Sequence, residues 1–178
     1  SRGLGDVYKR QVEQLRQQPQ AATATGWDAI VREVALDLAP LIADKMLDFE
    51  LRADTPVPLS AHEWMLRELV RNLLHNAIRH APPGSALLVT LTPQADRQHA
   101  CLHIIDQGPG LSEELLQRLY QPFSAGDTRN GSGLGLAICL EIVQALHGRL
   151  ELHNRQQGAR ILGLEAVACL PMAPAEGA

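Results

Sequence analysis

The stretch Glu68-Leu-Val-Arg-Asn72-Leu-Leu-His-Asn76-Ala-Ile-Arg79-His80 places polar side chains at a spacing of four residues. On an α-helix, Glu68, Asn72 and Asn76 therefore lie along one face. The residues between them are mainly apolar, which predicts that much of the remaining helix surface is buried. One carboxylate and two carboxamides in a row offer the oxygen ligands that suit a hard divalent cation such as Mg²⁺. The alternative is a helix with a solvated polar edge.

The composition limits the classes of function. The 178 residues fit one domain with a hydrophobic core. A net charge of −4, an aromatic content of 3% and the lack of a basic run argue against nucleic-acid binding. We find neither an apolar run that spans a bilayer nor a signal peptide. Cys101, Cys139 and Cys169 fit no metal-binding spacing, and we predict that they are reduced core residues of a cytosolic protein.

Lysine occurs only at Lys9 and Lys45, so a phosphate-binding loop of the form G-x-x-x-x-G-K-[ST] is excluded. If the protein binds a nucleotide, backbone N–H groups, arginine, histidine and a metal ion must contact the phosphates.

Hydrophobic periodicity divides the chain into elements. Residues 1–11 show no periodicity, and we expect them to be foreign or disordered. Residues 12–26 are interpreted as the end of a helix and a linker, 27–171 as one domain, and 172–178 as a disordered tail. Within the domain we predict helices at 28–46, 61–80, 112–119 and 133–147, and strands at 47–52, 86–92, 99–106, 149–154 and 160–170.

Most connections between these strands are hairpins. This pattern predicts an α+β two-layer sandwich with a mixed, mainly antiparallel sheet and about three main helices.

Two glycine-rich segments are candidate ligand sites. Asp106-Gln-Gly108-Pro-Gly110 follows a buried strand, and taken alone it fits a simple turn. In the functional interpretation, Asp106 accepts a hydrogen bond from an exocyclic amine such as adenine N6, and the glycines let the backbone approach the ligand. The segment 131–138, Gly-Ser-Gly-Leu-Gly-Leu-Ala-Ile, opens a helix and could bind an anion, or it could be a flexible loop that caps the helix. It follows a polar loop and not a strand, which argues against a dinucleotide-binding fingerprint.

These segments, together with Gln121-Pro-Phe123, occur in the order of the N, G1, F and G2 boxes. Over residues 28–171 the chain resembles the catalytic ATP-binding domain of sensor histidine kinases, in the GHKL superfamily. The resemblance implies a Bergerat-type fold that binds ATP and Mg²⁺. It also implies roles for the helix: Asn76 would bind Mg²⁺, with Glu68 and Asn72 as supporting metal ligands and catalytic residues. Arg79 and His80 would contact phosphates or line the nucleotide.

The resemblance extends to the glycine-rich segments and the loop between them. Asp106 would select adenine, with Gly108 and Gly110 beside it, and residues 111–130 would form a lid anchored by Phe123. The phosphate end would be held by Gly131, Gly133, Leu134, Gly135 and Leu136. Two positions depart from the family pattern: Gln107 replaces the common Asn, and the F box holds a single aromatic residue.

The implied activity is transfer of the ATP γ-phosphate to a histidine of a dimerisation domain, and then to a response regulator. His62-Glu63 is the only His-Glu pair, and we interpret His62 as a surface residue, so the acceptor histidine is expected outside this chain. The chain would be a monomeric cytoplasmic domain of a protein in a bacterial inner membrane. Two alternatives are a GHKL hydrolase with Glu68 as general base and a non-catalytic nucleotide-binding module.

Overall fold

The structure of the protein, a computed structural model, describes residues 2–17, 24–119 and 132–174. The helices are α1 (Arg2–Gln17), α2 (Trp27–Asp37), α3 (Ala39–Asp44), α4 (Glu63–His80), α5 (Glu113–Leu119) and α6 (Ser132–Ala145). The strands are β1 (Thr25–Gly26), β2 (Asp48–Arg52), β3 (Pro58–Leu59), β4 (Ala86–Pro93), β5 (His99–Ile105), β6 (Arg149–Gln157) and β7 (Arg160–Pro171).

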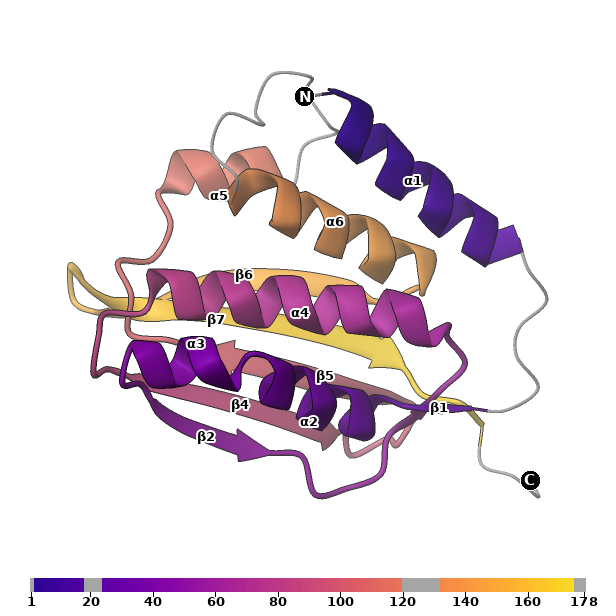
Figure 1. Ribbon diagram of the computed structural model, residues 1–178, viewed down its shortest axis with the longest axis horizontal. Helices are drawn as coiled ribbons and strands as arrows, with labels where there is room; N and C mark the ends of the chain where they lie inside the picture. The colour runs from indigo at the N-terminus through magenta and orange to yellow at the C-terminus, as the bar shows by residue number, and fades with distance from the viewer. Residues whose placement is uncertain (1, 18–23, 120–131, 175–178) are drawn as a thin grey trace.

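The main sheet has five strands in the order β2-β4-β5-β7-β6 (Figure 1). Strand β2 pairs with β4 in parallel, because α4 forms the crossover between them, and every other pair in this sheet is antiparallel. The predicted hairpins, β4–β5 and β6–β7, are both present. The prediction of a mixed, mainly antiparallel sheet is confirmed.

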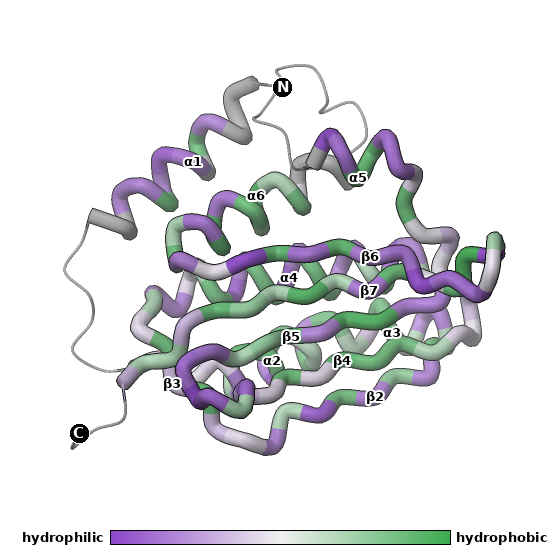
Figure 2. Tube along the Cα trace, turned by 180° about the vertical axis from the view of Figure 1, so that it is seen from behind, coloured by the Kyte–Doolittle hydropathy of each residue, from purple (hydrophilic) through white to green (hydrophobic). Residues whose placement is uncertain are grey.

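Helices α2, α4 and α6 cover one face of this sheet (Figure 1). The alternation of residues in β4 points Leu87, Val89 and Leu91 toward the helices, and each is at most 3% exposed. Helix α4 meets these strands with a row of buried apolar side chains that includes Leu66, Leu69, Val70, Leu73 and Leu74. The other face of the sheet carries no helix among the described residues (Figure 2). The two-layer α+β prediction is confirmed.

Residues 1–11 were predicted to be foreign or disordered, and the prediction of disorder is wrong for residues 2–11. Residues 2–17 form the single helix α1, which lies along α6 (Figure 1). Val12 of α1 is 3% exposed and belongs to the main hydrophobic core, so packing on α6 accounts for the helix. Whether the first eleven residues are foreign to the natural protein stays a prediction.

The described ends of the linker and of the tail, residues 24–26 and 172–174, contact the rest of the domain. Thr25 and Gly26 form β1, which pairs with β3. After β7, the backbone N–H groups of Met172 and Ala173 donate hydrogen bonds to the Gln98 and Pro58 carbonyl oxygens, at 2.7 and 2.8 Å. These long-range backbone hydrogen bonds fix residues 25–26 and 172–173 against the domain.

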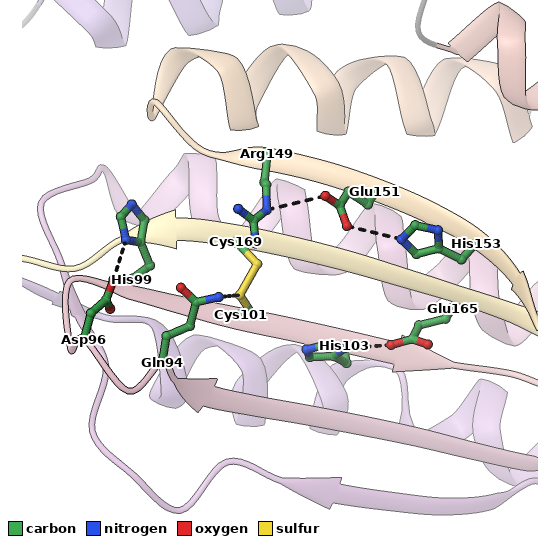
Figure 3. Close-up of a disulfide and its surroundings, with 10 residues drawn as sticks. All are labelled: Gln94, Asp96, His99, Cys101, His103, Arg149, Glu151, His153, Glu165 and Cys169. Carbon is green, nitrogen blue, oxygen red and sulfur yellow. Dashed lines mark hydrogen bonds and ion pairs between the residues drawn. A yellow bond between two sulfur atoms is a disulfide. The ribbon is translucent and has the colours of Figure 1, made fainter.

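Two of the three cysteines are joined by a disulfide, so the prediction of three reduced cysteines is wrong. Cys101 on β5 lies directly opposite Cys169 on β7, and their Cα atoms are 4.1 Å apart (Figure 3). Facing residues of antiparallel strands approach closely enough for such a bond. Together with Val167, the pair forms a small apolar cluster on the sheet face away from the helices. Cys139 is the free cysteine and is buried, as predicted.

Candidate nucleotide-binding site

The polar row predicted on α4 is present, and its three members are half-buried. Asn72 is turned toward Glu68: its side-chain nitrogen donates to the Glu68 carbonyl oxygen at 2.7 Å and lies 3.5 Å from the Glu68 carboxylate. The amide oxygen of Asn72 remains available to another partner. Among the described residues, the Asn76 amide makes no hydrogen bond, which leaves its oxygen free as a ligand.

The start of α6 lies beside this row. A Cβ added to Gly135 would lie 3.2 Å from the side-chain oxygen of Asn72, so the close approach of the two helices depends on a glycine there. One turn further along α6, the Cys139 thiol donates to the Leu69 carbonyl oxygen of α4 at 3.8 Å. Leu136, between them, is 4% exposed. The helix contact therefore brings together the N box and the described part of the G2 box.

Asp106 directly follows β5, the central strand of the sheet, and is a buried carboxylate that is 3% exposed. Its Oδ1 atom accepts two hydrogen bonds, from the backbone N–H of Gly108 at 2.8 Å and from that of Leu164 at 3.1 Å. No other hydrogen bond to this carboxylate occurs among the described residues. One carboxylate oxygen is therefore fixed by the protein backbone, while the other is left for a donor from a ligand.

The turn after Asp106 contacts the end of α4, strand β4 and strand β6. A Cβ on Gly108 would lie 2.7 Å from the His80 carbonyl oxygen, so this glycine lets the turn contact the end of α4. Gly110 has φ +72°, and a Cβ there would lie 2.5 Å from the Asn154 side-chain oxygen. The side chain of Gln107, the departure from the family pattern, accepts a hydrogen bond from the Ala86 N–H at 2.7 Å and so ties the turn to β4.

Two residues that the sequence analysis missed shape this turn. Gly163 on β7 packs directly on the Asp106 backbone, where a Cβ would overlap the carbonyl oxygen. Asn154 on β6 accepts from the Leu111 N–H at 2.8 Å and donates to the Leu111 carbonyl at 2.6 Å. The only sequence signal for Gly163 is a glycine inside a strand pattern, which indicates close backbone approach. No comparable signal points to Asn154.

The end of α4 supplies Arg79 and His80. Arg79 is exposed, whereas His80 is half-buried and its Nε2 atom has no hydrogen-bond partner among the described residues. The pKa of His80 is lowered by burial and then by the positive charges of Arg79 and Lys45, while Asp106 opposes them. The imidazole is therefore favoured in its neutral form beside the Asp106 turn.

Several predicted site residues lie partly or wholly outside the described structure. Phe123, Gly131 and residues 120–130 of the predicted lid are outside it, and α5 forms the described part of that segment. Gly133 and Leu134 belong to the first turn of α6, and only their backbone is described. The other ten predicted residues are described, and the structure brings α4 together with the start of α6 at Asn72 and Gly135, and with the Asp106 turn at His80 and Gly108. The ten are Glu68, Asn72, Asn76, Arg79, His80, Asp106, Gly108, Gly110, Gly135 and Leu136.

Comparison with known proteins agrees with this arrangement. Residues 61–173 match the family described as Histidine kinase-, DNA gyrase B-, and HSP90-like ATPase. Sensor protein CreC of Escherichia coli is 29% identical over 164 residues, which are 90% of this chain and 34% of that protein. Sensor protein kinase PmrB of Pseudomonas aeruginosa is 32% identical over 145 residues, which are 80% of this chain and 29% of that protein. The chain thus spans about a third of the length of these relatives.

Solved structures show the same fold. The mycobacterial sensor histidine kinase MprB superposes with a TM-score of 0.72 at 28% identity, covering 88% of this chain and 100% of that one. The catalytic domain of the histidine kinase ThkA has a TM-score of 0.71 at 22% identity and covers 86% of this chain and 98% of that one. The chain belongs to the family of histidine kinase-, DNA gyrase B- and HSP90-like ATPases, as an ATP-binding catalytic domain of the sensor histidine kinase type.

Proposed function

We propose that this domain binds ATP with Mg²⁺ and transfers the γ-phosphoryl group to a histidine on a dimerisation domain. The observation that carries the proposal is the buried Asp106 carboxylate, with one oxygen bonded to the backbone and the other left for a ligand. Phosphoryl transfer depends mainly on positioning and charge neutralisation, so the domain need not supply a covalent nucleophile.

The Asp106 turn would select the base. A carboxylate oxygen accepts a hydrogen bond from the exocyclic N6 amine of adenine. Guanine has an O6 carbonyl at the equivalent position, which is also an acceptor and would be repelled. Gly108 and Gly110 let the turn pack closely on the His80 carbonyl oxygen and on the Asn154 side chain, which would hold the Asp106 carboxylate in place. This arrangement supports ATP as the substrate.

Glu68, Asn72 and Asn76 lie along one face of α4, and their side-chain oxygen atoms would be the ligands of Mg²⁺. The ion prefers oxygen ligands and usually keeps waters and substrate phosphates in its shell, so one carboxylate and two amides suffice. When bound, Mg²⁺ neutralises charge on the phosphate oxygens. The Asn72 contact with Glu68 turns the amide nitrogen away and leaves its oxygen for the ion.

The phosphates would lie between the end of α4 and the start of α6. The exposed Arg79 supplies positive charge, and the backbone N–H groups of the glycine-rich helix start, from 131 to 135, would bind the anion. Neutral His80 would line the nucleotide without adding a charge. Residues 111–130, with Phe123, would close over it and exclude water during transfer.

The same proposal indicates what full-length protein this domain belongs to and which proteins it acts with. The phosphoacceptor histidine would lie outside this chain, and a response regulator would take the phosphate next. None of the helices in the described residues could cross a bilayer, and we propose that the parent sits in a bacterial inner membrane with this domain in the cytoplasm. The chain alone would be monomeric.

A calorimetric titration with ATP, with and without Mg²⁺, tests the nucleotide site. In Asp106→Asn the amide oxygen can still accept from Gly108 and Leu164, and the substitution replaces the other oxygen by a donor. A hydrogen bond to a charged group contributes about 1.5–3 kcal/mol, so ATP binding should weaken about 10- to 100-fold. Asp54→Asn changes an exposed carboxylate and serves as the matched control. Absence of Mg²⁺-dependent binding by the wild type would contradict the proposal.

Labelled ATP then distinguishes kinase from hydrolase. With a two-helix histidine-bearing dimerisation domain supplied separately, the wild type should form acid-labile phosphohistidine on that domain. Half-buried Glu68 beside Asn72 could instead act as general base on water, as in the GHKL hydrolases. Free phosphate release that is lost in Glu68→Gln, with ATP binding kept and no labelled histidine, would favour hydrolysis.

A further inference from the structure

Lys45 lies in the turn between α3 and β2, and its ammonium group meets the C-terminal end of α4. The Nζ atom donates to three backbone carbonyl oxygens, those of Ile78 at 2.8 Å, Arg79 at 2.7 Å and Ala81 at 3.0 Å. The last carbonyls of a helix have no partner within it and form the negative end of its dipole. An ammonium group has three donors and a positive charge. The Lys45 side chain therefore supplies hydrogen-bond donors to the carbonyl oxygens at the end of α4 and offsets the negative end of the helix dipole.

The turn that carries Lys45 is fixed independently of its side chain. The Lys45 carbonyl oxygen accepts from the Gly84 N–H at 2.9 Å, and its own N–H donates to the Leu41 carbonyl at 3.3 Å. Met46, the next residue, has φ 52° and reverses the chain into β2. The tight turn thus positions the ammonium group, which contacts the end of α4, 33 to 36 residues further along the chain.

The end of α4 is the part of the helix that meets the adenine side of the site. Arg79 and His80 are its last two residues, and the His80 carbonyl oxygen lies against Gly108, next to the Asp106 turn. A shift of this helix end would move Arg79 and His80 relative to Asp106. The three carbonyl contacts of Lys45 oppose such a shift.

The charge of Lys45 also acts on His80. Among the described residues, the charges of Arg79, Lys45 and Asp106 act on this imidazole. Burial and the two cations lower the pKa of His80, whereas Asp106 raises it. Removal of the ammonium group should therefore raise the pKa of His80, a change that can be measured separately from binding.

We propose that Lys45 is a positioning residue of the nucleotide site: its ammonium group holds the end of α4, so that Arg79 and His80 meet a nucleotide bound at Asp106. This inference rests on the proposed ATP-binding function. Among the described residues, the Lys45 ammonium group donates hydrogen bonds only to the end of α4, so its effect passes through the helix backbone.

The test compares Lys45→Met with Lys9→Met in the full 178-residue chain. Both variants lose one lysine charge and keep a flexible apolar side chain, but Lys9 is exposed on α1, away from the end of α4. Affinity for ATP in Mg²⁺ is measured by calorimetry, at a temperature where thermal unfolding curves show every variant to be folded. The pKa of His80 is measured by NMR of its imidazole.

A chemical rescue separates positioning from general destabilisation. In Lys45→Cys, alkylation by 2-bromoethylamine displaces bromide and forms a thioether that ends in an ammonium group, close in length to lysine. Cys139 is buried, which raises the pKa of its thiol, and Cys101 and Cys169 are joined, so the thiol introduced by the substitution is the reactive one. Alkylation by iodoacetamide gives a neutral side chain as the comparison.

We expect Lys45→Met to weaken ATP binding at least tenfold and to raise the pKa of His80, and Lys9→Met to change neither. Aminoethylation, but not the neutral alkylation, should restore both quantities. Unchanged ATP affinity in Lys45→Met, or equal affinity after the two alkylations, would overturn the role of Lys45 while leaving the proposed function intact. Failure of the wild type to bind ATP would overturn both.

Discussion

Gly163 on β7 packs directly against the backbone of Asp106, the residue that follows β5. A Cβ at position 163 would overlap the Asp106 carbonyl oxygen and approach the Gln107 Cα to 3.0 Å. These neighbours are backbone atoms, which cannot turn aside as a flexible side chain can. The adjacent Leu164 supplies one of the two N–H groups that fix the Asp106 carboxylate. The placement of Asp106, which we propose selects adenine, therefore depends on a glycine in a neighbouring strand.

Gly163→Ala should displace β7 from Asp106 and lengthen the Leu164 hydrogen bond. Forcing an extra carbon into a packed site costs about 1–3 kcal/mol, so we expect a lower midpoint of urea unfolding and weaker ATP binding. Gly26→Ala is the control, because a Cβ there meets its nearest atom, in the Asp28 side chain, at 3.4 Å. Wild-type ATP affinity in Gly163→Ala would show that this contact does not position Asp106.

Asn154→Ala should loosen the start of α5. The substitution removes both hydrogen bonds to Leu111, each worth about 0.5–1.5 kcal/mol. Hydrogen exchange followed by mass spectrometry should show faster exchange in residues 110–119 and little change in α4. Gln156→Ala, at an exposed position of the same strand, provides the control. Equal exchange in the two variants would indicate that α5 is held by other contacts.

His80 should make the protein less stable in mild acid. The folded state keeps the pKa of His80 below its ordinary value of 6.5, through burial first and the neighbouring cations next. The unfolded chain therefore takes up the proton more readily, and the free energy of unfolding should fall as pH drops from 6.5 through the folded-state pKa.

His80→Phe removes this titration and the buried, unpartnered Nε2 atom. Urea unfolding at about pH 8 and about pH 5.5, on either side of the ordinary histidine pKa, should show a smaller loss of stability for His80→Phe than for the wild type. His75→Phe changes an exposed histidine of the same helix and should retain the wild-type loss. An identical decline in all three proteins would assign the acid sensitivity to other groups.

Reduction of the Cys101–Cys169 bond should destabilise the domain. The bond closes a loop with a sequence separation of 68 residues, and disulfides typically contribute about 2–4 kcal/mol by restricting the unfolded chain. Thermal unfolding should shift to lower temperature in the presence of a phosphine reductant. The double variant Cys101→Ser, Cys169→Ser should start at that lower temperature and should not respond to the reductant. A reductant-induced shift of equal size in the double variant would contradict this assignment.

The local features of the fold were predictable because they depend on residues close together in the sequence. The fourfold spacing of Glu68, Asn72 and Asn76 predicts the polar face of α4, and the β-rich run at 86–92 predicts strand β4. The spacing of Leu4, Tyr8 and Val12 by four residues is a local signal that fits the helix at residues 2–17, contrary to the prediction for residues 1–11. The order of the four boxes predicted the family correctly.

The sequence by itself determined the α+β class, the order of the elements and the identity of residues such as Asp106, because periodicity and local motifs encode which face of an element is buried. Only the tertiary structure decided that Cys101 faces Cys169, that Gly163 supports Asp106, and that Lys45 caps α4. These pairs join residues between 33 and 68 positions apart. Strand register and helix contacts bring these residues together, and the local pattern of residues predicts neither.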